Sequence, residues 1–128
     1  MTTLLYTAAI FTFAIGISHS VLGEKYILTR LFRRDNIPHL FGSPEFTIMT
    51  LRFAWHITTI AWWGLAAILI LIAEKLLTVN NVLLVIAVTF LISGVVSLIA
   101  SKAKHYSWII FLIIGGCSLY VAMHNLVN

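Results

Sequence analysis

Four apolar stretches of about 20 residues dominate the sequence, and each is long enough to cross the roughly 30 Å hydrocarbon core of a bilayer. Hydrophobic residues make up 61% of the chain and charged residues only 9%, whereas soluble domains carry about a quarter charged residues. Because the hydrocarbon offers no water to backbone groups, each stretch must be helical. The sequence predicts an all-α integral membrane protein, a single domain over residues 1–128 that forms an antiparallel four-helix bundle, with spans at about 3–22, 48–73, 82–100 and 106–127.

The connection between the first two spans, residues 23–47, is the only long loop. Within it, the stretch from Glu24 to Arg34 places Ile27, Leu28 and Leu31 on one helical face and basic residues around the other. This pattern is typical of a helix that lies in the headgroup region of the membrane. The remaining connections are short, which predicts that consecutive helices are antiparallel neighbours.

The basic residues indicate the orientation of the chain in the membrane. They gather beside the first and third loops, whereas the N-terminus carries no Lys or Arg and no basic segment that would mark a cleaved signal. We therefore expect these two loops in the cytoplasm and both termini in the periplasm, in a bacterial inner membrane. On this interpretation the basic residues behind the net charge of +4 set the orientation in the membrane and do not bind nucleic acid. The residues concerned are Lys25, Arg30, Arg33, Arg34, Arg52, Lys102 and Lys104.

Two histidines fall inside the predicted spans at matching depths, about one turn from the cytoplasmic side. Ionisable side chains are costly in hydrocarbon, so His19 and His56 are candidates for a functional site. Helical spacing also places Arg52, His56, Thr59 and Trp63 on one face of the second span. The sequence therefore predicts a polar site in the cytoplasmic leaflet.

Three interpretations of this site remain open at the level of sequence. His19 and His56 would hold b-type haem iron or a metal ion, with Arg52 available to pair with the haem propionates. They would instead hydrogen-bond neighbouring helices as structural contacts, or handle protons, since imidazole titrates near neutral pH. The accessory candidates are Glu24, Thr59, Trp63 and His105.

Small and hydroxyl-bearing residues recur every four positions in two spans. Thr89, Ser93 and Ser97 form such a row in the third span. Rows of this kind favour close helix packing, within or between protomers, and the alternative is a polar path through a small oligomeric channel or transporter. A third hypothesis is a structural subunit of a membrane complex, which, like the channel, implies a second copy or a partner membrane protein. The sequence carries no motif for a catalytic residue, so we do not expect an enzyme.

Two segments resemble a known group of proteins. They are Gly16–Lys25 (GISHSVLGEK) and Leu51–Gly64 (LRFAWHITTIAWWG), which contain the patterns GxxHSxLGE and LRFAWHxTxxAWWG. Both are similar to segments of small uncharacterised four-span bacterial inner-membrane proteins. The resemblance implies the same four-helix membrane fold over nearly the whole chain, and implies no activity.

Overall fold

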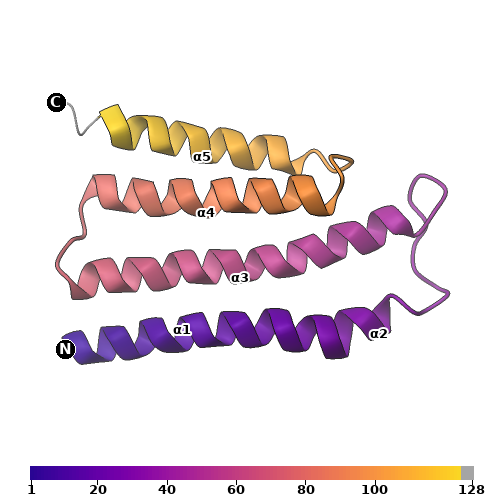
Figure 1. Ribbon diagram of the computed structural model, residues 1–128, viewed down its shortest axis with the longest axis horizontal. Helices are drawn as coiled ribbons and strands as arrows, with labels where there is room; N and C mark the ends of the chain where they lie inside the picture. The colour runs from indigo at the N-terminus through magenta and orange to yellow at the C-terminus, as the bar shows by residue number, and fades with distance from the viewer. Residues whose placement is uncertain (125–128) are drawn as a thin grey trace.

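The computed structural model describes residues 1–124, and in it four long helices lie side by side (Figure 1). All four are long and apolar enough to cross a membrane, which confirms the predicted all-α, multi-pass membrane fold. The elements are α1 (Thr2–Leu22), η1 (Gly23–Leu28), α2 (Thr29–Leu31), α3 (Glu45–Ala73), α4 (Val79–Ala100) and α5 (Ser107–His124).

The helices form a row in the order α1, α3, α4 and α5, and neighbours in the row run antiparallel (Figure 1). Within residues 1–124, substantial helix packing joins only neighbours in this order. An apolar groove follows each side of the α3–α4 contact, and both grooves are lined by Gly64, Val85 and Thr89, which form the contact between them. The bundle is therefore an open layer of helices with two broad faces.

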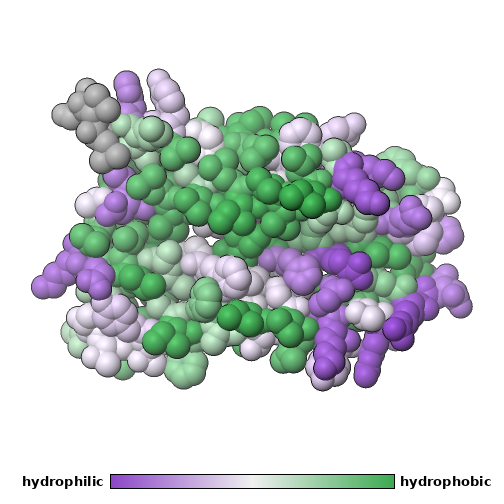
Figure 2. All heavy atoms as spheres, viewed as in Figure 1, coloured by the Kyte–Doolittle hydropathy of each residue, from purple (hydrophilic) through white to green (hydrophobic). Residues whose placement is uncertain are grey.

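Polar groups gather at the two ends of the row. Figure 2 shows an apolar band across the middle of the visible face and hydrophilic atoms toward both ends. One end carries the loop 32–44 and the α4–α5 turn with their cationic residues, and we call it the basic end. At the opposite end the hydroxyl of Tyr6 donates to the carboxylate of Glu74, which ties the start of α1 to the end of α3.

The first helix is longer than the sequence predicted. We expected it to stop near Leu22 and a separate interfacial helix to follow, but the helix runs from Thr2 to Leu31 without a break. Gly23 has φ −61° and ψ −49°, the right-handed helical values, and not the left-handed values that end a helix. The widened π-turn of η1, in which the Thr29 N–H reaches back to the Glu24 carbonyl, carries the helix onward.

The other helix boundaries differ from the sequence prediction by a few residues. Helix α3 begins at Glu45 instead of 48, and the Pro44 carbonyl accepts the Ile48 N–H in its first turn. Helix α4 begins at Val79 instead of 82, because the Thr78 hydroxyl caps it by accepting from the Asn81 N–H. The predicted end of the last span, residues 125–127, lies outside the described residues.

Each neighbouring pair in the row meets at a glycine. A methyl group at Gly64 would lie 2.5 Å from Thr89 Oγ1 at the α3–α4 contact. At the α4–α5 contact, a methyl group at Gly115 would lie 2.7 Å from Leu91 Cγ and 3.0 Å from its backbone nitrogen. Such distances leave no space for a side chain, so the glycines set how closely the helices approach.

We expect Gly115→Val to lower the free energy of unfolding by about 1 to 3 kcal/mol, the usual cost of an overpacked contact. The adjacent Gly116 is the matched control, because a methyl group there meets no atom within 4 Å. Thermal unfolding in detergent micelles measures both variants. Equal destabilisation by Gly116→Val would mean that the loss reflects glycine replacement in general and not the α4–α5 contact.

Candidate functional site

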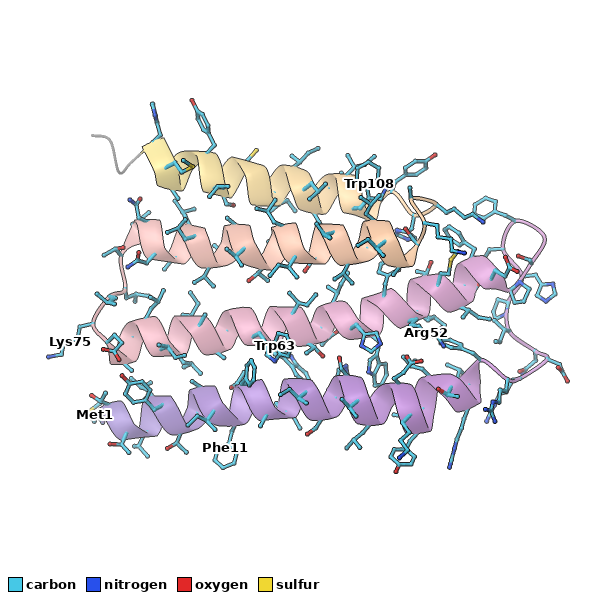
Figure 3. The ribbon with its side chains drawn as sticks, in the orientation of Figure 1. Met1, Phe11, Arg52, Trp63, Lys75 and Trp108 are labelled. Atoms are coloured by element: carbon cyan, nitrogen blue, oxygen red, sulfur yellow. The ribbon has the colours of Figure 1, made fainter. Side chains whose placement is uncertain are left out.

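A charged cluster joins the first helix to α3 at the basic end. Glu24 lies in η1, and its two carboxylate oxygens contact different side chains of α3. The Oε1 atom lies 3.1 Å from Nη2 of Arg52, and Oε2 lies 3.3 Å from Nε2 of His56. Arg52 and Trp63 lie on the side of α3 that faces α1 (Figure 3). The carboxylate therefore bridges a guanidinium and an imidazole across the helix pair.

The cluster continues into the membrane as a line of hydrogen bonds. His56 Nδ1 lies 2.9 Å from the Ser20 hydroxyl, which lies 2.8 Å from the Thr59 hydroxyl. Thr59 in turn donates to the Gly16 carbonyl at 3.1 Å, and its side chain is buried. We call these five groups, from the Glu24 carboxylate to the Gly16 carbonyl, the polar chain.

Gly16 allows the polar chain to form because it has no side chain. A methyl group there would lie 2.7 Å from Nε1 of Trp63 and 3.3 Å from Cγ2 of Thr59. Trp63 uses the space to donate to the Phe13 carbonyl at 3.3 Å, and its ring stacks on the Phe13 ring. The α3 face predicted from sequence, formed by Arg52, His56, Thr59 and Trp63, thus contacts the first helix along about three turns.

The other predicted ligand, His19, has different neighbours. Its imidazole stacks on Trp55 with ring centroids 4.4 Å apart and planes 3° from parallel, and it also contacts Trp62 at 4.9 Å. Trp55 is held in place by its own N–H, which donates to the His19 carbonyl at 3.0 Å. Within the described residues, Nε2 of His19 is buried without a hydrogen-bond partner.

The structure therefore brings the two helices together at the predicted depth but gives each imidazole its own partners. His19 and Ser20 are adjacent and project from α1 about 100° apart, so His19 contacts Trp55 while Ser20 contacts His56. In residues 1–124 no group of three or more His, Cys, Asp or Glu side chains is placed to hold a metal ion. These contacts add no support to the hypothesis of haem or metal ligation by His19 and His56.

His105, the remaining accessory candidate, belongs to a separate network at the α4–α5 turn. Its Nδ1 lies 2.9 Å from the Ser107 hydroxyl, which lies 2.6 Å from the Ser97 hydroxyl. Its ring lies between Phe46 and Phe53 of α3, with ring centroids 5.6 Å and 5.1 Å away. His105 thus links α3 to the α4–α5 hairpin and is not part of the polar chain.

The hydroxyl row of α4 is engaged in packing and in hydrogen bonds. Thr89 and Ser93 donate to the carbonyls of Val85 and Thr89, four residues earlier in the same helix. Ser97 is fully buried against α5. This arrangement favours the packing interpretation of the row over a polar path.

Sequence reasoning missed the role of Ser20. Ser20 ends the four-residue row of the first span, Ala8, Thr12, Gly16 and Ser20, for which the sequence suggested helix packing or a polar path, whereas Ser20 connects His56 to Thr59. The available signal was its depth, which matches that of His56 and Thr59 on the neighbouring span. The sequence could not show which neighbouring residue of α1, His19 or Ser20, faces His56.

Comparisons with protein-family models, curated proteins and solved structures found no match for this chain.

We expect Thr59→Val to lower the free energy of unfolding by about 1 to 3 kcal/mol, because it removes the buried Thr59 hydroxyl that bonds both the Gly16 carbonyl and the Ser20 hydroxyl. Thr58→Val is the matched control, since the Thr58 hydroxyl donates only to the Ala54 carbonyl of its own helix. Thermal unfolding in detergent compares the two. If both variants lose the same stability, the polar chain contributes nothing beyond an ordinary threonine hydroxyl.

Proposed function

We propose that the protein binds a proton at the Glu24–His56 pair, near the basic end of its membrane-spanning region. The observation that carries the proposal is the polar chain, whose five groups form an unbroken series of contacts within hydrogen-bonding distance. The direction of its hydrogen bonds determines how many protons the site must hold.

The direction follows from the inner end of the polar chain. The Gly16 carbonyl can only accept, so Thr59 uses its single hydroxyl hydrogen there. Ser20 must then donate its own hydrogen to Thr59. The remaining contact, between Ser20 and Nδ1 of His56, is a hydrogen bond only if Nδ1 carries a proton.

The outer end of the polar chain requires one further proton. With Nδ1 protonated, Nε2 of a neutral imidazole has only a lone pair, and it faces a carboxylate oxygen of Glu24. These two acceptors repel one another unless a proton lies between them. Two forms satisfy every contact: an imidazolium beside a carboxylate, or a neutral imidazole beside a protonated carboxyl group. Both hold one proton more than a neutral imidazole with a carboxylate.

The surroundings of the pair support a role in proton binding over proton conduction. Arg52 remains paired with the other oxygen of Glu24, and the side chains of Glu24 and Arg52 are 36% and 45% exposed, so protons can reach the site from the basic end. The polar chain stops at the Gly16 carbonyl, inside the first helix. Proton uptake would therefore strengthen the contact between the first helix and α3 from one side of the membrane.

The test is nitrogen NMR of protein with labelled histidines in lipid nanodiscs, compared with Glu24→Gln. In the wild type we expect a proton on Nδ1 of His56, and a second one either on Nε2 or on Glu24. In Glu24→Gln the amide can donate to Nε2, so we expect a neutral imidazole with its proton on Nδ1. Glu45→Gln, which removes a carboxylate outside the polar chain, should leave the His56 signals unchanged.

Infrared spectroscopy decides between the two forms, because a protonated Glu24 has a carboxylic acid band that Glu24→Gln removes. Either form supports proton binding. A wild-type protein with Nδ1 of His56 unprotonated, or with one proton on His56 and a charged Glu24, would contradict the proposal.

The hypothesis of a haem or metal site makes a separate prediction. A b-type haem held by His19 and His56 would give the purified protein a Soret band that His56→Ala abolishes, and a metal ion would appear in stoichiometric amounts in elemental analysis. His56 would have to give up its contact with Glu24 or Ser20 to act as a ligand. For this reason we place proton binding first.

A second candidate function, a structural subunit of a membrane assembly, is favoured by the open row of helices. The grooves beside the α3–α4 contact, about 340 and 350 Å³, leave apolar surface on both faces. A second copy or another membrane protein would cover this surface, and the same assembly would be needed for any channel. Cross-linking in native membranes would show a defined complex, while a monomer would count against this function.

We further propose that the basic end faces the cytoplasm of a bacterium, with the N-terminus in the periplasm, because cationic loops are retained on the cytoplasmic side. The segments Gly16–Lys25 and Leu51–Gly64, which carry the resemblance to small four-span proteins, contain all five groups of the polar chain and Arg52. We propose that the small four-span proteins that these segments resemble bind a proton in the same way.

A further inference from the structure

A groove of about 380 Å³ lies on the flank of the first helix, beside the polar chain but separate from it. Its walls come from α1, η1 and α3, and Glu24, Arg52 and His56 are not among its lining residues. The groove opens outward and its lining is mostly apolar. Since α1 and α3 cross the membrane, this opening faces lipid.

The floor of the groove is aromatic. The stacked rings of His19 and Trp55 line it together with Trp62. Gly23 allows this arrangement, because a methyl group there would lie 2.3 Å from Nε1 of Trp55. The three rings give the groove an aromatic lining against which an acyl chain can pack.

The mouth of the groove toward the basic end is cationic. Tyr26 lines the groove, and the ammonium nitrogen of Lys25 lies 5.2 Å from the centroid of the Tyr26 ring. Lys25 is six residues beyond His19, about 9 Å along a helix axis. Ile15, one turn deeper in the membrane than His19, ends the lining with an aliphatic side chain, and Leu22 lies between His19 and the mouth; both are about half exposed. The groove therefore has a cation at one end and an aromatic and aliphatic lining along the rest of its length.

We propose that this groove binds one anionic phospholipid. Its phosphate pairs with Lys25 at the mouth, and one acyl chain covers Leu22 and the aromatic floor and continues over Ile15. The proposal rests on charge complementarity and on depth, because the cation lies at the headgroup end of the groove and the apolar lining lies on the hydrocarbon side. Aromatic side chains such as Tyr26 are common at this level of a membrane. The inference is independent of the proton site.

The experiment is native mass spectrometry of the protein released from micelles that contain equal amounts of phosphatidylglycerol and phosphatidylcholine. We expect the wild type to retain one phosphatidylglycerol in preference to phosphatidylcholine. Lys25→Gln should reduce this preference about fivefold, the effect of one cation at a membrane surface. Arg34→Gln is the matched control: it also removes one exposed positive charge at this end, but Arg34 is seven residues beyond Ile27, the last lining residue of the first helix, whereas Lys25 lies between the lining residues Gly23 and Tyr26.

A second variant tests the groove itself without changing charge. Ser18 lines the groove, so Ser18→Phe should fill it and reduce retention of both lipids. Equal retention of the two lipids by the wild type, or equal effects of Lys25→Gln and Arg34→Gln, would leave only diffuse attraction between basic residues and the membrane and would overturn the proposal. Unchanged retention in Ser18→Phe would show that the lipid binds elsewhere.

Discussion

Helices inside a bilayer gain little hydrophobic free energy by packing together, because lipid tails are as apolar as the side chains they replace. The packing of the helices in this protein therefore depends on close van der Waals contact and on hydrogen bonds between them. A glycine lies at every contact of the row: Gly16 between α1 and α3, Gly64 between α3 and α4, and both Gly94 and Gly115 between α4 and α5. The α1–α3 pair adds the polar chain, and the α4–α5 pair adds the Ser97–Ser107–His105 network.

The sequence was enough to predict the four spans, because their length and composition follow directly from the thickness and polarity of the bilayer. It was also enough to place Arg52, His56, Thr59 and Trp63 on one helical face, since that depends only on helical spacing. It could not predict that Gly23 continues the first helix, because a glycine after a span commonly ends a helix, whereas here its missing side chain makes room for Trp55, 32 positions away. Nor could it predict the rotation of α1 that turns Ser20 toward His56 and His19 toward Trp55.

Two adjacent residues of α1 thus belong to two different sites. Ser20 takes part in the polar chain, in the seam between the helices, while His19 forms part of the aromatic floor of the lipid-facing groove. Both are fixed by neighbouring residues of α3, His56 and Trp55. A small rotation of α1 about its axis would disturb the polar chain and the groove together, so the two sites are mechanically connected although they share no side chain.

The unequal lengths of the helices also have a consequence for the surrounding bilayer. The first helix spans 30 residues and α3 spans 29, about 45 Å each, whereas the 22 residues of α4 measure about 33 Å. At the basic end the first helix and α3 project beyond α4 (Figure 1). The last turns of the first helix carry Glu24, Lys25 and Arg30, so its extra length at this end adds charged surface and not apolar height. Lipid headgroups beside α1 therefore meet a taller charged surface than those beside α5, where the chain turns back at residues 101–106.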